Sequence, residues 1–103
     1  MIFNKNLIDS FVNVTSQAAI SCFEYLGKKD KNLADKAATD EMRKNLNLLD
    51  IDGKVVIGEG ELDEAPMLYI GEKLGTGKGP SLDIAVDPLE GTNFAAKNLP
   101  GAL

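Results

Sequence analysis

The sequence contains no histidine and no tryptophan, and it has a single cysteine, Cys22. Without histidine, this chain can supply neither imidazole acid–base catalysis nor a His-ligated zinc site. One cysteine cannot form an intrachain disulfide, so we expect a reducing compartment, most simply the cytoplasm. Cys22 lies among the apolar positions of an expected helix and is predicted to be an inert core thiol.

Basic residues are also few, because 11 lysines and arginines stand against 16 acidic residues and give a net charge of −5. No basic patch stands out, so we expect no nucleic-acid partner. No apolar run approaches the length of a membrane span, and the first residues lack the apolar stretch of a signal peptide, so we expect no membrane partner. Clustered carboxylates could instead bind divalent cations, and through them an anionic substrate.

The length of 103 residues, with a hydrophobic fraction of 44%, suffices for one domain with a small core. Two helices are predicted at 6–26 and 33–49, with Asn6 as the N-cap of the first and Gly27 as its C-terminal stop. Strands are predicted at 54–58, 67–71 and 82–86. The glycine-rich stretch 75–80 lacks the pattern of a phosphate-binding loop and is interpreted as a turn. These elements predict an α/β fold.

The most informative segment is Asp-Ile-Ala-Val-Asp-Pro-Leu-Glu-Gly-Thr at 83–92. An apolar strand delivers Asp87, proline ends the strand, and Glu90, Gly91 and Thr92 follow. The two carboxylates flank a tight turn, and a short stretch compatible with a helix follows. This arrangement suits divalent cations that bind a phosphate at the start of a helix. The alternative is an acidic turn that binds nothing, because Asp, Pro and Gly are common turn residues.

Further acidic residues follow the strand predicted at 54–58. Glu59 comes directly after it, as Asp87 comes after its own strand, and ligand sites in α/β sheets lie at the carboxyl ends of strands. The two strands therefore suggest one shared site. Glu61 and Asp63 stay open between a role in that site and simple solvation of the chain, and Glu64 is interpreted as solvated.

Asp35 lies on the apolar stripe of the second predicted helix, in line with Ala38 and Met42. A carboxylate on such a stripe must be paired or bind a cation, because burying an isolated charge is costly. The alternative is an acid of the first turn that the helix dipole favours. Asp40 lies about 140° around the helix from Asp35, at 100° per residue, and is predicted to be solvated.

Three blocks of the sequence, at 31–38, 55–77 and 83–92, together resemble class II fructose-1,6-bisphosphatase. The longest block reads Val-Val-Ile-Gly-Glu-Gly-Glu-Leu-Asp-Glu-Ala-Pro-Met-Leu-Tyr-Ile-Gly-Glu-Lys-Leu-Gly-Thr-Gly. The wider group is the lithium-sensitive, metal-dependent phosphatases, which include the inositol monophosphatases and carry the signature Asp-Pro-Ile/Leu-Asp-Gly-Thr. Glu90 stands in place of the second aspartate of that signature, which is the variant typical of class II.

The resemblance implies a layered α/β sugar-phosphatase fold, in which two N-terminal helices precede the strands of the sheet. It implies that the catalytic cations, Mn²⁺ or Mg²⁺, are bound by Asp35, Glu59, Asp87 and Glu90. It also implies that the sugar phosphate is contacted by Glu90, Gly91 and Thr92. Asp87 would be essential for activity, Glu59 would orient or deprotonate a water, and Thr92 would orient a water or a phosphate oxygen.

The implied reaction is hydrolysis of the 1-phosphate of fructose 1,6-bisphosphate to fructose 6-phosphate and phosphate, a step of gluconeogenesis, by an enzyme that is commonly a homo-oligomer. Members of the family are several-fold longer, so residues 1–103 are expected to be the N-terminal portion of a sugar-phosphatase domain. Three alternatives stay open: sedoheptulose 1,7-bisphosphate as substrate, an inositol phosphate as substrate, and an inactive fragment that binds metal.

Overall fold

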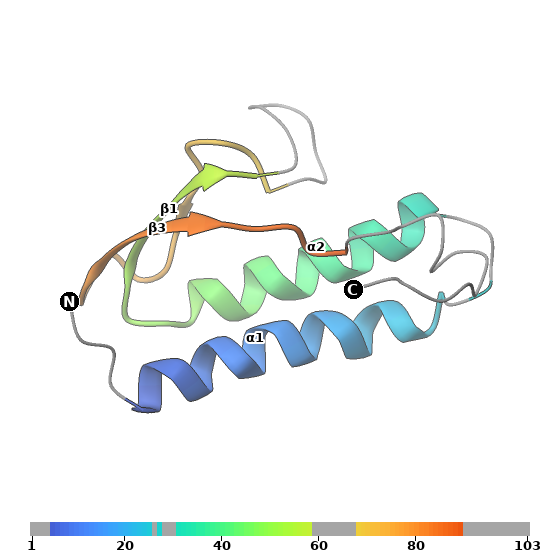
Figure 1. The fold of residues 1–103 in the computed structure, drawn as a ribbon, viewed down its shortest axis with the longest axis horizontal. Helices are drawn as coiled ribbons and strands as arrows, with labels where there is room; N and C mark the ends of the chain where they lie inside the picture. The colour runs from blue at the N-terminus through green and yellow to red at the C-terminus, as the bar shows by residue number, and fades with distance from the viewer. Residues whose placement is uncertain (1–4, 26, 28–30, 59–67, 90–103) are drawn as a thin grey trace.

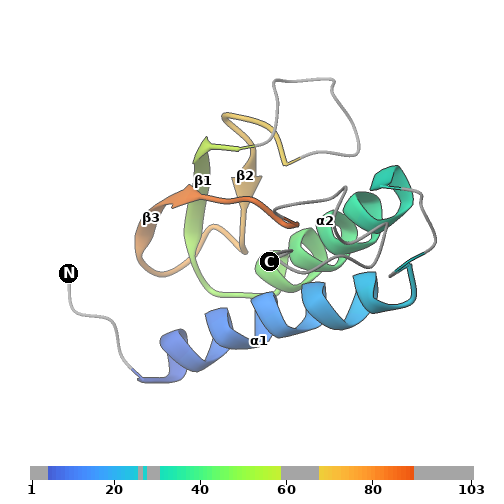
Figure 2. The same cartoon turned by 45° about the vertical axis from the view of Figure 1, so that its right-hand side comes forward.

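The computed structural model describes residues 5–25, 27, 31–58 and 68–89. Two helices, α1 (Lys5–Phe23) and α2 (Lys31–Asn47), precede three strands, β1 (Asp52–Ile57), β2 (Lys73–Leu74) and β3 (Ser81–Ala85). The helices lie next to each other on one side of the sheet (Figure 1, Figure 2). This arrangement confirms the predicted α/β class.

The helix prediction is confirmed for both segments, with small differences at their ends. Asn6 is not the N-cap, because α1 already begins at Lys5 and the carbonyl of Asn6 accepts a hydrogen bond of 2.9 Å from the Ser10 hydroxyl within the helix. Gly27 has a φ of 76°, the left-handed conformation that glycine adopts where a helix has ended. The two helices run in opposite directions (Figure 1).

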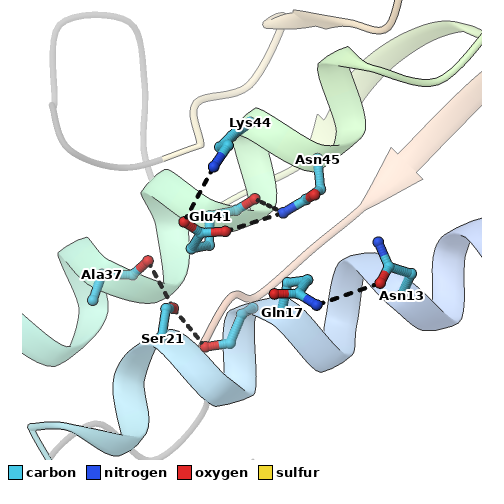
Figure 3. Close-up of polar contacts among 8 residues, drawn as sticks. Asn13, Gln17, Ser21, Ala37, Glu41, Lys44 and Asn45 are labelled. Carbon is cyan, nitrogen blue, oxygen red and sulfur yellow. Dashed lines mark hydrogen bonds and ion pairs between the residues drawn. The ribbon is translucent and has the colours of Figure 1, made fainter.

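The helices pack through small and flexible side chains. The most deeply buried apolar helix positions, each at most 5% exposed, are Val14, Ala18, Ala34, Ala38, Met42 and Leu46. Small residues let two helices approach closely, so that a side chain of one helix can reach the backbone of the other. The Ser21 hydroxyl lies 2.8 Å from the carbonyl oxygen of Ala18 and 3.0 Å from that of Ala37 on α2 (Figure 3). It therefore connects the two helices.

The sheet has the strand order β2-β1-β3, with β2 antiparallel and β3 parallel to β1. The predicted strands at 54–58 and 82–86 correspond to β1 and β3. The predicted strand at 67–71 is wrong over its described part, because only Tyr69 forms a bridge and Gly71 turns the chain with a φ of 92°. The amide of Glu72 donates to the Tyr69 carbonyl at 3.1 Å, so this segment closes a turn before the short strand β2.

The connection between β2 and β3 confirms the prediction of a turn at 75–80. Gly75, Gly77 and Gly79 all have φ between 86° and 98°. A Cβ added at Gly75 would lie 2.4 Å from the carbonyl oxygen of Ile51, and one added at Gly79 would lie 2.1 Å from that of Asp50. The connection therefore needs glycine for both its backbone angles and its close approach to the chain that precedes β1.

One face of the sheet packs on the helices, and its other face is charged. Val55 in β1 is fully buried, whereas its neighbour Lys54 is exposed and pairs in register with Lys73 on one side and Asp83 on the other. An apolar groove of about 510 Å³ lies between α1 and β3, with Ile8 and Val12 more than half exposed in its lining. Within the described segments, neither helix is apolar enough over a sufficient length to span a membrane.

Candidate metal site

The carboxyl ends of β1 and β3 lie side by side. Ile57 pairs with Ala85, and the amide of Val86 donates a hydrogen bond of 2.9 Å to the carbonyl of Ile57. Because the two strands are parallel, the chain leaves both of them at the same edge of the sheet. Asp87 follows β3 by two residues, as residue 59 follows β1, so the two positions follow neighbouring strand ends.

Asp87 is exposed at this edge, while the residues on either side of it are held by the protein. Val86 packs partly buried against the core, and Pro88 and Leu89 are buried. Pro88 cannot donate to a sheet ladder, which agrees with the end of the strand at Ala85. Asp87 is thus an exposed residue between residues that pack against the core.

Asp35 lies in the first half of α2 and is half-buried. Its neighbours on the same helix, Ala34 and Ala38, are at most 1% exposed and belong to the same buried cluster as Leu89. The start of α2 and the chain after Asp87 therefore share one core, and both views show the segment after β3 beside α2 (Figure 1, Figure 2).

Asp40 behaves as predicted, as a solvated charge. It is exposed, and its Oδ2 forms an ion pair with Nζ of Lys36, 2.5 Å away and one turn earlier on α2. The two aspartates of this helix therefore differ in burial, and only Asp35 lies next to the core.

The other predicted site residues fall outside the described residues: Glu59, Glu61, Asp63, Glu90, Gly91 and Thr92. Within the described ranges, no group of three or more potential metal ligands lies together. Asp35 and Asp87 are the two members of the predicted ligand set that the structure describes.

The sequence did not reveal a partly buried ion pair between α2 and the segment before β2. Arg43 donates to the two carboxylate oxygens of Glu72, with Nε to Oε2 at 2.7 Å and Nη2 to Oε1 at 3.1 Å. The Glu72 side chain is 9% exposed. This hydrogen bonding raises the pKa of Arg43 above its usual value. The partners are 29 residues apart, so no local spacing could reveal them.

Gly58 and Leu68, which are described, pack closely against each other, and we call this pair the neck. A Cβ added at Gly58 would lie 2.4 Å from the carbonyl oxygen of Leu68. Next to the neck, the amide of Gly71 donates to the Val55 carbonyl at 2.7 Å, and the amide of Val55 donates to the Glu72 carbonyl at 2.9 Å. The end of β1 is therefore bonded to the turn that precedes β2.

Comparison with known proteins identifies the family. Residues 5–103 match the family described as bacterial fructose-1,6-bisphosphatase, glpX-encoded. The chain is 56% identical over 99 residues to fructose-1,6-bisphosphatase 1 class 2 of Escherichia coli, which covers 96% of this chain and 30% of that protein. It is 50% identical over 100 residues to the class 2 enzyme of Haemophilus influenzae, which covers 97% of this chain and 30% of the relative.

Another relative, whose name gives two activities, has a similar sequence identity to this chain. The D-fructose 1,6-bisphosphatase class 2/sedoheptulose 1,7-bisphosphatase of Synechococcus sp. (strain CC9902) is 51% identical over 100 residues, again 97% of this chain and 30% of the relative. The chain thus spans about 30% of the length of these curated relatives. Because the family match extends over nearly the whole sequence, the chain belongs to the glpX-encoded bacterial fructose-1,6-bisphosphatase family.

Proposed function

We propose that this chain supplies the greater part of the metal site of an enzyme that hydrolyses the 1-phosphate of fructose 1,6-bisphosphate to fructose 6-phosphate and phosphate. The family match over residues 5–103 supports this proposal most strongly. The parallel pairing of β1 and β3 adds support, because it brings the ends of the strands that precede residue 59 and Asp87 to the same edge of the sheet.

The residues proposed to hold the cations, Mn²⁺ or Mg²⁺, are Asp35, Glu59, Asp87 and Glu90. Both cations prefer oxygen ligands, and all four side chains are carboxylates. The exposure of the two described ones is compatible with this role: Asp87 is exposed at the edge of the sheet, and Asp35 is half-buried next to the core. When bound, such cations neutralise phosphoryl oxygens and lower the pKa of a coordinated water.

The other proposed roles belong to protein groups near these carboxylates. Glu59 would orient the attacking water and accept its proton. Glu90 and Gly91 would contact the sugar phosphate, and the Thr92 hydroxyl would orient a water or a phosphate oxygen. Asp87 would be indispensable.

A second substrate, sedoheptulose 1,7-bisphosphate, is favoured by one observation. The Synechococcus relative that is 51% identical carries both activities in its name. None of the proposed site residues distinguishes a six-carbon from a seven-carbon sugar. We therefore propose both bisphosphates as substrates to be compared.

We further propose a cytoplasmic enzyme that assembles as a homo-oligomer at the length of its relatives. The lone cysteine supports the reducing compartment. For the 103 residues alone we propose metal binding without turnover, since they span about 30% of the relatives' length.

Two proteins test the proposal: the 103-residue chain, and a chimera in which residues 5–103 replace the matching part of the Escherichia coli enzyme. Phosphate release from each bisphosphate is measured with and without Mn²⁺, and binding of Mn²⁺ to the short chain is measured separately. We expect Mn²⁺-dependent release by the chimera and Mn²⁺ binding by the chain. A folded chimera that releases no phosphate from either sugar would refute the proposed activity.

A further inference from the structure

We propose that Arg43 and Glu72 are positioning residues for the metal site: their ion pair holds α2, which carries Asp35, against the neck from which Glu59 follows. This inference rests on the proposed function, because it concerns how the proposed ligands are held in place. It assigns a role to two residues outside the ligand set.

The pair has the geometry of a fixed connection. Arg43 uses two nitrogens and Glu72 uses both oxygens, at 2.7 Å and 3.1 Å. Two parallel hydrogen bonds define an orientation as well as a distance, which a single contact does not. The Arg43 and Glu72 side chains are 28% and 9% exposed, so solvent screens the pair less than it screens the exposed ion pairs of α2.

Glu72 carries this connection into the turn beside the neck. The oxygen that accepts from Arg43 Nη2 also accepts from the amide of Tyr69 at 3.3 Å. The backbone of Glu72 bonds to Val55 of β1 and to the carbonyl of Tyr69. The Glu72 side chain therefore contacts both α2 and the turn that contains Tyr69. The Glu72 backbone contacts β1, the strand that ends at the neck.

Arg43 lies on α2, the same helix as Asp35, so it joins the ion pair to the helix that carries this proposed ligand. It lies about two turns further along α2 than Asp35, and a helix of this length transmits position as a stiff rod. If the pair were lost, α2 would lose its bond to the turn before β2, while its last residue, Asn47, would still accept a hydrogen bond of 3.0 Å from the amide of Gly75. The expected result is a change in the separation between Asp35 and the residues that follow β1.

The test uses the 103-residue chain and measures its affinity for Mn²⁺ from the electron paramagnetic resonance signal of free Mn²⁺. Arg43→Lys keeps the positive charge but loses the two-point geometry. Lys44→Gln is the matched control, because it removes a positive charge from the next residue of α2, whose side chain is 69% exposed. A double variant, Arg43→Met with Glu72→Met, replaces the pair by apolar side chains and leaves no unpaired buried charge.

We expect Arg43→Lys and the double variant to bind Mn²⁺ about 10- to 100-fold more weakly than the unmodified chain, at a temperature where circular dichroism shows them folded. Lys44→Gln should bind at least as tightly as the unmodified chain. Lys44→Gln removes a positive charge, which on charge alone strengthens binding of a cation, whereas Arg43→Lys and the double variant leave the net charge unchanged. Weaker binding in those two variants therefore reports position rather than net charge.

Each outcome bears on a different claim. Unchanged Mn²⁺ affinity in folded Arg43→Lys and in the folded double variant overturns the positioning role and leaves the proposed function intact. A folded, unmodified chain that binds no Mn²⁺ overturns the proposed metal site and this inference with it. Weaker binding in both variants, with the control unchanged, supports both proposals.

Discussion

The amide of Val86 donates a hydrogen bond to the carbonyl of Ile57, at the point where two parallel strands end. This bond joins positions 29 residues apart, and each is followed within two residues by an acidic residue of the predicted ligand set. Backbone pairing therefore brings the two strand ends that precede these acidic positions to one edge of the sheet.

The two aspartates of α2 give the first prediction. Asp35→Asn removes a half-buried carboxylate beside the core, and we expect it to weaken Mn²⁺ binding by the chain at least tenfold, about 1.4 kcal/mol. Asp40→Asn is the matched control, since it removes the same charge from an exposed position paired only with Lys36 among the contacts given above. Calorimetric titration with Mn²⁺ compares the two. Equal losses in both variants would show that overall charge, not a site at Asp35, governs binding.

The second prediction concerns stability. Arg43→Met leaves the carboxylate of Glu72 buried without its charged partner, and we expect it to lower the free energy of unfolding by about 3 kcal/mol. Lys44→Gln breaks only an exposed contact of 3.9 Å with Glu41 and should cost under about 1 kcal/mol (Figure 3). Urea denaturation followed by circular dichroism measures both. Similar midpoints for the two variants would contradict the structural importance of the buried pair.

The third prediction separates two glycines of the turn at 75–80. Both Gly75 and Gly77 have positive φ, at 98° and 86°, so alanine strains the backbone at either position by about 1 kcal/mol. A Cβ at Gly75 also meets the Ile51 carbonyl at 2.4 Å, whereas nothing lies within 4 Å of one at Gly77. We expect Gly75→Ala to cost at least about 1 kcal/mol more than Gly77→Ala. Thermal melts of the two variants check the order, and the reverse order would contradict the packing of this turn.

The fourth prediction concerns Cys22 and pH. Burial raises the pKa of its thiol above the usual 9.0, so the folded state favours the neutral form. The stability linked to this group is complete below the pKa of the unfolded chain and falls as pH rises from there through the folded pKa. Alkylation by iodoacetamide against pH should have a higher midpoint for the folded chain than for the chain in urea. The single cysteine makes the signal unique, and equal midpoints would show that the thiol is not shielded.

Local patterns in the sequence were sufficient to predict the helices, β1, β3 and the glycine turn. Helical spacing and β-branched runs report burial along one element, and burial decides these elements. The strand predicted at 67–71 failed because its apolar residues are followed by Glu72, whose carboxylate accepts from the Tyr69 amide and pairs with Arg43. That pairing depends on a helix 29 residues away, which no local pattern contains.

The candidate site could be predicted in the same way only in part. The sequence predicted Asp87 after a buried strand and Asp35 on an apolar stripe. In the structure the residues of β3 are half-buried or exposed, Asp87 is exposed and Asp35 is half-buried. The parallel pairing of β1 with β3 could only be inferred by analogy with other α/β sheets, because strand order depends on how distant elements pack. The Arg43–Glu72 pair could not be inferred at all.

The central claim is that Asp87, at the shared edge of β1 and β3, is part of a working metal site for sugar bisphosphate hydrolysis. The most direct test is Mn²⁺-dependent phosphate release from fructose 1,6-bisphosphate by the chimera with the Escherichia coli enzyme, with and without Asp87→Asn. We expect release by the unmodified chimera and a loss of at least about a thousandfold, about 4 kcal/mol of transition-state stabilisation, in the variant. A folded Asp87→Asn chimera that retains full Mn²⁺-dependent turnover would contradict the account.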